Sequence, residues 1–328
     1  MNFARTIRRS AKSLLFAVLA LALLNRLPLR AHDSPEHEIE VLTSRMSKAG
    51  KTGSLLMRRA TEFKALGELD KAAADLTEAI SLEPKSPAAY AELGRVQFAQ
   101  GKLAEACDNA TRSLTLIEDA GERGAVFLLR AQIEAARGRN AEALADCELA
   151  DRRDDLDWYL IRSQIQRSLG KLDARVAGLK DGFARNGSIV LEIESIEAMI
   201  DAGQFHPALD LIDQHLNQLR LRSSWLLRRA RALKGLKADF QADAKAALAE
   251  LERRIRPEHP EPTLLLDRAT AFALLGNEKA AREDIKAAQK HGMPASACDR
   301  VESLLKSSKL VAAETTAAAD KQKTTTHD

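Results

Sequence analysis

Two histidines near the start of the chain are the residues whose types and spacing best suit metal chemistry. His32 follows Ala31, where a leader segment could be cleaved, and His37 stands five residues later. A free N-terminal amine and an imidazole nitrogen together are good ligands for Cu²⁺. His32 and His37 therefore define a possible copper site, whereas the simpler interpretation is a polar mature N-terminus with no ligand role. The sequence suggests no other metal site and no cofactor.

The remaining reactive residues do not form a catalytic pattern. Gly50-Lys51-Thr52 resembles the end of a phosphate-binding loop, but position 45 is Arg where that loop requires Gly. The chain contains no GxSxG, HExxH, CxxC or GxGxxG motif. Cys107 and Cys147 are expected to be small buried residues, with a disulfide between them as the alternative. We therefore expect no catalytic residues and no enzymatic activity.

The first 31 residues have the pattern of an export leader. Six basic residues and no acidic residue lie in 1–31, and Leu14–Leu24 is an unbroken apolar run. Such a run is too short to cross a bilayer comfortably, which takes about 20 residues, and it fits a secretory signal peptide. We expect an exported protein, periplasmic or extracellular. The alternative is an uncleaved anchor that holds the chain on a membrane through residues 14–24.

The net charge of +3 comes from this leader. Without its six basic residues, the rest of the chain has three more acidic than basic residues. A protein that binds nucleic acid or anionic lipid usually presents a basic surface. No nucleic-acid partner is therefore expected, and a membrane is expected only if the leader stays uncleaved.

A pattern with a period of 34 residues organises the rest of the chain. Between Gly53 and Leu66, apolar residues recur every three or four positions, as in an amphipathic helix. Gly67 then interrupts the pattern, and a second helix is expected from about Leu69 to Leu82. The residues that mark this first unit are Leu56, Arg59, Ala60, Phe63, Gly67, Ala72, Leu76, Ala79 and Pro84. The residues that follow Leu56, Arg59, Ala60, Gly67 and Ala72 by 34 positions are Tyr90, Leu93, Gly94, Gly101 and Ala106.

Two further signals repeat along the chain. A short tag recurs in the first helices, as LLMRRA at 55–60, FLLRA at 127–131, WLLRRA at 225–230 and LLLDRA at 264–269, with YLIRS at 159–163 a weaker copy. The tag arginines are expected to lay their stems over neighbouring helices, with the guanidinium near acidic residues. The expected turn residues are Gly67, Gly101, Gly138, Gly170, Gly203, Gly276 and, once, Lys237.

This repeat resembles the tetratricopeptide repeat (TPR), a helix–turn–helix unit of about 34 residues. The resemblance implies an all-α fold, a right-handed α-solenoid of about seven such units whose first helices line a concave groove. The expected organisation is a signal peptide or uncleaved anchor at 1–31, an N-terminal helix at 32–52, the TPR array at 53–290, a capping helix at 291–310 and a disordered tail at 311–328.

The resemblance also implies which residues face a partner. By position in each unit, the expected groove residues are Met57, Thr61, Lys64, Arg95, Phe98, Gln132, Gln164, Arg167, Arg231 and Lys234. Charge reversal at Arg95, Arg167 and Arg231 is expected to weaken partner binding without lowering the melting temperature. A groove of mixed polar and apolar residues suits an extended or helical peptide.

Three functions remain open at this point. The first is an exported protein–protein interaction scaffold that binds a peptide or protein in the concave groove and performs no catalysis. The second is a membrane-tethered assembly subunit of an envelope complex. The third is a copper-binding protein that uses a mature N-terminal His32.

Overall fold

The computed structural model describes residues 34–218, 220–295 and 297–306. The expected leader 1–31, the candidate ligand His32 and the expected tail 311–328 lie outside these residues. All regular structure within them is helical, with no strand, which confirms the all-α class. No helix in the same part of the chain is both long and apolar enough to cross a membrane.

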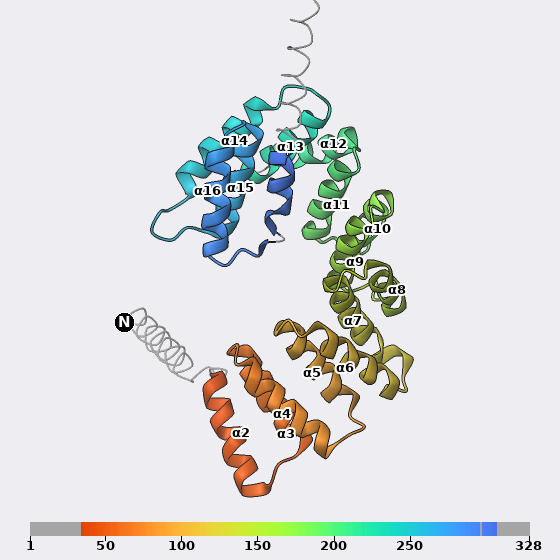
Figure 1. Ribbon diagram of the computed structural model, residues 1–328. Coiled ribbons are helices and arrows are strands. Elements are labelled where there is room, and N and C mark those ends of the chain that lie inside the picture. Colours follow the sequence, from red (N-terminus) through yellow and green to blue (C-terminus); the bar gives the residue numbers. More distant parts are fainter. Residues whose placement is uncertain (1–33, 219, 296, 307–328) are drawn as a thin grey trace, which may run out of the picture. The chain divides into compact units, whose positions relative to one another are not determined.

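The described residues fall into two compact units, divided between Asp151 and Arg152. Unit 1 begins with α2 (Pro35–Ala49) and continues with three helix pairs (Figure 1). These pairs are α3 (Gly53–Ala65) with α4 (Leu69–Leu82), α5 (Pro87–Ala99) with α6 (Leu103–Leu116), and α7 (Gly124–Ala136) with α8 (Asn140–Ala150). A short 3₁₀ turn, η1 (Ala120–Glu122), precedes α7.

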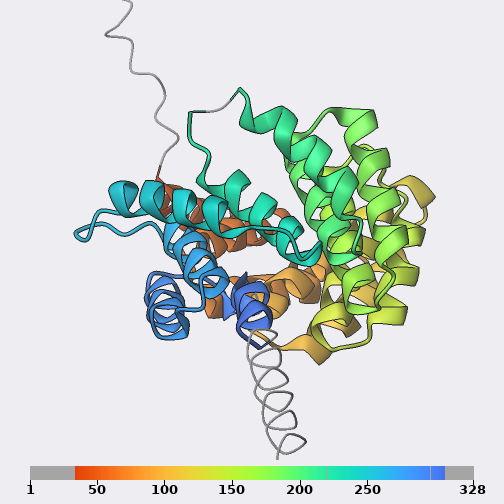
Figure 2. The same cartoon turned by 90° about the horizontal axis from the view of Figure 1, so that it is seen from above.

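Unit 2 contains four more pairs and a final short helix. The pairs are α9 (Leu156–Ser168) with α10 (Leu172–Asn186), α11 (Ile189–Asp201) with α12 (Phe205–Leu216), α13 (Ser223–Gly235) with α14 (Gln241–Arg254), and α15 (Pro262–Leu274) with α16 (Glu278–Lys290). The final helix, described over 297–306, lies within the expected range 291–310. Figure 2 shows the pairs of unit 2 following one another in chain order. The paired-helix repeat expected from the sequence is therefore confirmed.

Each pair turns at the residue expected from the sequence. Gly67 has a φ of +75°, a value that glycine reaches without steric cost. Its N–H donates to the carbonyl of Lys64, and the N–H of Glu68 donates to the carbonyl of Phe63, which together form a Schellman motif. The same two hydrogen bonds end the first helix of each later pair. In the pair α13–α14 the residue with the positive φ is Lys237, at +57°. One local rule therefore sets the helix–turn–helix geometry along the chain.

The tag arginines fasten the two helices of a pair together. Arg59 of α3 donates two hydrogen bonds, each 2.7 Å long, to the carboxylate of Asp75 in α4. The same bidentate contact joins Arg130 to Asp146, and Arg268 to Asp284, always sixteen residues apart. These contacts raise the pKa of each arginine, chiefly through the hydrogen bond to aspartate. The expected position of the tag arginines near acidic residues is confirmed.

Small residues allow the two helices of a pair to approach closely. Ala72, Ala79, Ala106 and Ala110 are all completely buried in the second helices of the first two pairs. The Cα of Gly94 lies so close to α6 that an added Cβ would meet the carbonyl oxygen of Ala106 at 3.1 Å. The core is therefore a series of thin alanine-rich layers between helices, and aromatic residues make up only 4% of the chain.

Candidate functional site

The first helices of successive pairs form the inner side of each unit. In unit 1, α3 contacts α5 and α5 contacts α7. In unit 2, α9 contacts α11, α11 contacts α13 and α13 contacts α15. Among the described residues, no two successive second helices approach each other in the same way. We call the side formed by the first helices the inner face of each unit.

On the inner face of unit 1, two of the expected residues belong to one open charged cluster. Lys64 of α3 and Arg95 of α5 share the carboxylate of Glu92, at 2.9 Å and 3.6 Å. The three side chains keep between 30% and 35% of their surface exposed. Two cations thus share one carboxylate in contact with solvent, which leaves this cluster with a net positive charge.

A pocket of about 230 Å³ lies beside this cluster. Arg95, Glu92 and Ala91 line it from α5, and Val126 lines it from α7. Pro87, Ala88, Ser113, Ile117 and Glu122 complete the lining. The pocket therefore offers apolar walls with one basic side chain, Arg95, and two acidic side chains, Glu92 and Glu122.

The other expected residues of unit 1 lie on α3, α5 and α7. Thr61 is exposed, and its hydroxyl donates to the carbonyl of Met57. Met57 is half-buried and packs against the core between α2, α3 and α4. Phe98 and Gln132 are half-buried. All of these residues come from first helices, so the structure places them on the elements expected from the sequence.

The inner face of unit 2 is closed by ion pairs. Glu197 of α11 is completely desolvated and pairs with Arg231 and Arg228 of α13 and with Arg300 of the final helix. Burial alone would raise the pKa of Glu197, but the three arginines outweigh it and lower this pKa to about 2. Glu197 is therefore ionised throughout the physiological range and holds three helices together.

A second carboxylate extends this network. Asp201, one turn after Glu197, accepts from Arg175 of α10 at 2.8 Å and lies 3.3 Å from Arg167 of α9. Arg175 is 2% exposed and also donates to the hydroxyl of Ser163. The network thus connects α9, α10, α11, α13 and the final helix. We refer to Glu197, Asp201 and the arginines paired with them as the ionic network.

Several expected groove residues of unit 2 already have partners within the chain. Arg231 is 8% exposed in its pair with Glu197, so its charge reversal is expected to lower the melting temperature rather than leave it unchanged. Arg167 is exposed but already paired with Asp201. Lys234 is half-buried over the ring of Phe240, and burial lowers its pKa. Of the expected residues in unit 2, Gln164 on α9 is exposed.

Asp267 is a functional-site candidate that the sequence analysis missed. It lies on α15 at the tag position where Arg58 and Arg228 stand in other units. Burial is the main cause that raises its pKa to about 6; the charge of Glu197 acts in the same direction, and the charges of Arg228 and Arg254 oppose it. An acid held at such a cost is often found at a functional site. The signal in the sequence was its negative charge, because the residue at this position is basic or apolar in the other tags.

The residues considered for metal and redox chemistry do not come together. His37 is exposed at the start of α2, where its backbone N–H donates to the side-chain oxygen of the N-cap residue Ser34. No cluster of three or more His, Cys, Asp or Glu side chains with metal-binding geometry occurs in residues 34–218, 220–295 and 297–306. Cys107, Cys147 and Cys298 are buried free thiols, so the alternative of a Cys107–Cys147 disulfide is not found. The Cys107 thiol donates to Glu134 at 2.9 Å.

The Gly50-Lys51-Thr52 segment serves the start of α3. The Thr52 side chain accepts from the N–H of Leu55 and caps the helix, and Lys51 pairs with Glu78 at 2.6 Å. Both polar side chains are thus used in local contacts.

Comparison with known proteins identifies the repeat. Residues 61–101 match the TPR repeat family. A stretch of 51 residues is 49% identical to FK506-binding protein-like of Rattus norvegicus, and this match spans 16% of the chain and 14% of that protein. A crystal structure of a tetratricopeptide repeat protein from Parabacteroides merdae is 18% identical, with 77% of this chain and 97% of that chain covered and a TM-score of 0.58. At that identity the likeness shows the fold alone.

A further similar structure is that of YrrB, described as a TPR protein with an unusual peptide-binding site. It is 14% identical over 76% of this chain and 99% of that chain, with a TM-score of 0.40.

Proposed function

The chain is a tetratricopeptide repeat protein, and we propose that it is a non-catalytic scaffold that binds a protein or peptide partner on the inner face of unit 1. The TPR fold supports an interaction scaffold in general. The observation that carries the assignment to unit 1 is the pocket beside Arg95, with its apolar walls and its charged edge. On the inner face of unit 2, Arg231 is buried in its pair with Glu197, and the exposed Arg167 is already paired with Asp201.

The chemistry of the face indicates the kind of partner. Lys64 and Arg95 are the cations of this face and Glu92 and Glu122 are its carboxylates, so an acidic side chain of the partner would compete with these carboxylates for Arg95. Val126, Ala91 and Pro87 would contact an apolar side chain next to it. A peptide that places an apolar side chain in the pocket and an acidic side chain at Arg95 therefore fits this face.

The test uses matched charge reversals in the full chain. Arg95→Glu should weaken capture of the partner from the native envelope fraction at least tenfold, because it replaces the attractive cation with a repulsive carboxylate. The control is Arg112→Glu, which makes the same charge change at an exposed position on the second helix α6. Equal capture by both variants would remove unit 1 as the binding face.

Export remains part of the proposal and needs its own experiment. The leader pattern supports an exported scaffold, and a membrane-tethered assembly subunit is the alternative. N-terminal sequencing of the protein from its native cells separates the two, since cleavage after Ala31 gives an N-terminal His32. Copper titration of that processed form, compared with His32→Ala, tests the third possibility. A Kd no tighter than micromolar would exclude copper binding.

A further inference from the structure

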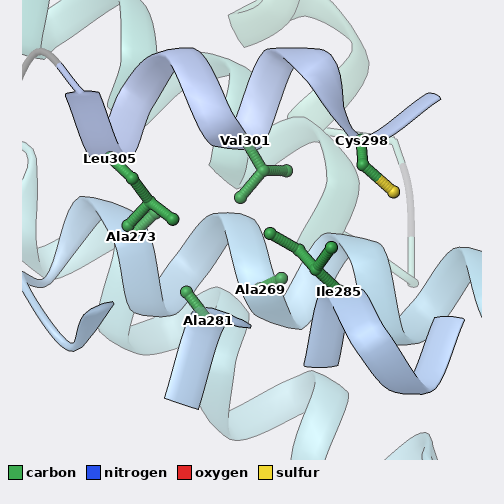
Figure 3. Close-up of a cluster of buried hydrophobic side chains, with 7 residues drawn as sticks. All are labelled: Ala269, Ala273, Ala281, Ile285, Cys298, Val301 and Leu305. Atoms are coloured by element: carbon green, nitrogen blue, oxygen red, sulfur yellow. The ribbon is translucent and has the colours of Figure 1, made fainter. Parts of the chain in front are cut away.

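The final helix of unit 2 is bound on two different sides. Its apolar side, with Cys298, Val301 and Leu305, packs against α15 and α16 (Figure 3). The residues beneath it are Ala269, Ala273, Ala281 and Ile285. Three of these four are alanines, and Leu266 and Phe272 of α15 pack against the same cluster. This side accounts for the expected capping of the last repeat.

The other side of the same helix reaches the ionic network. Arg300 lies 3.4 Å from Glu197, which is about one hundred residues earlier in the chain and belongs to α11. Burial alone would lower the pKa of Arg300, but the charges of Glu197, Asp201 and Glu194 outweigh it and raise this pKa. The helix therefore contacts the inner face of unit 2 as well as its last pair.

The contact is built so that the helix can leave without stranding a buried charge. If Arg300 moves away, Glu197 still has Arg228 at 3.0 Å and Arg231 in direct contact. Breaking a buried pair is most costly when one partner is left alone, and here it is not.

We propose that the surface formed by Glu197 of α11 and the alanine-rich side of α15–α16 is a second docking surface, which takes an amphipathic helix with one arginine, and that the final helix of the chain occupies it as a displaceable internal ligand. An incoming helix must place an arginine where Arg300 lies and aliphatic side chains where Val301 and Leu305 lie. This inference concerns unit 2 and does not rest on the function proposed for unit 1.

A peptide of the internal ligand is the probe. A labelled, capped peptide of residues 297–306 is titrated by fluorescence anisotropy against the full-length wild-type chain and the full-length Arg300→Glu variant. The variant should bind at least tenfold more tightly, because its own helix is repelled by Glu197 and leaves the surface free. A peptide that itself carries Arg300→Glu should bind the variant at least tenfold more weakly than the wild-type peptide. Equal affinity of both chains, or no binding to either, would overturn the proposal.

Hydrogen exchange distinguishes a displaced helix from an unfolded unit. In Arg300→Glu, amides of 297–306 should exchange at least tenfold faster, while α15 and α16 keep their protection. The matched control is Lys306→Glu, a charge reversal at an exposed position of the same helix, which should leave exchange unchanged. If α15 and α16 lose protection together with 297–306, the helix is an integral part of the fold and the proposal is wrong.

Discussion

The inner faces of the two units are made of the same kind of helix but differ in how their charges are satisfied. In unit 1, Lys64 and Arg95 share one carboxylate and keep about a third of their surface. In unit 2, Arg231 faces Glu197 and Asp201 and keeps 7% of its side-chain surface. A repeat position therefore predicts where a side chain points, whereas the acids on neighbouring helices decide whether a partner can reach it.

The two units can also be observed separately in one experiment. Both tryptophans of the chain, Trp158 and Trp225, lie in unit 2 and are buried. Trp fluorescence therefore reports the unfolding of unit 2, while far-UV circular dichroism reports the helices of both units. The predictions below use this difference.

The largest effect is expected from charge reversal in the ionic network. Arg231→Glu would bury a carboxylate beside Glu197 and Asp201 and should destabilise unit 2 by at least about 3 to 5 kcal/mol. Urea unfolding followed by Trp fluorescence measures the loss. A midpoint within experimental error of the wild type would show that the two inner faces do not differ in the way described.

The second-largest effect is a gain of stability when Asp267, whose ionised form destabilises the folded chain, is replaced. Asp267 has a pKa of about 6 in the folded chain against an ordinary value of 3.8, so protonation favours the folded state. Ionisation of Asp267 therefore lowers the free energy of unfolding as the pH rises from about 4 to 6. At neutral pH this loss is about 2 to 3 kcal/mol. Asp267→Asn should therefore stabilise unit 2 at pH 7 and have little effect at pH 4.

The measurement for Asp267 is a pair of urea titrations at the two pH values, again by Trp fluorescence. Asp243→Asn on α14 is the contrasting variant, because Asp243 accepts a hydrogen bond from Arg229 and its loss should destabilise the same unit at pH 7. If Asp267→Asn does not stabilise unit 2 at pH 7, Asp267 is well solvated in the folded chain and the prediction is wrong.

The smallest effect on stability is expected in unit 1. Arg95→Glu breaks a partly exposed pair 3.6 Å long, and such pairs contribute about 0 to 1 kcal/mol. Circular dichroism should therefore show a melting curve close to that of the wild type, although partner capture falls. A loss comparable to that of Arg231→Glu would mean that the unit 1 face is also closed.

Much of the fold could be predicted because its determinants are local. The turn at Gly67 follows from one residue type at one position, and Lys237 was recognised as its replacement from the spacing alone. The contact of Arg59 with the second helix also follows from the repeat, since the tag arginines Arg59, Arg130 and Arg268 each meet an aspartate sixteen residues later. The individual burial of Arg231 could not be predicted in this way, because Glu197 stands 34 residues earlier on another first helix.

The final helix also has one contact that its sequence predicts and one that it does not. Its apolar spacing at Val301, Leu304 and Leu305 predicts a helix that caps the last repeat, and it packs there. Nothing in that spacing indicates that Arg300 meets Glu197, since their contact depends on the path of the chain through the five intervening helices α12 to α16.

The amino-acid sequence by itself determined that this protein consists of paired helices, where each pair turns, and how its two helices are fastened. These features depend on contacts within about thirty residues, which a repeating pattern records directly. Only the tertiary structure decided which inner face stays open and which is closed. The reason is that the solvation of a charged side chain is set by every helix packed around it, and those helices come from distant parts of the chain.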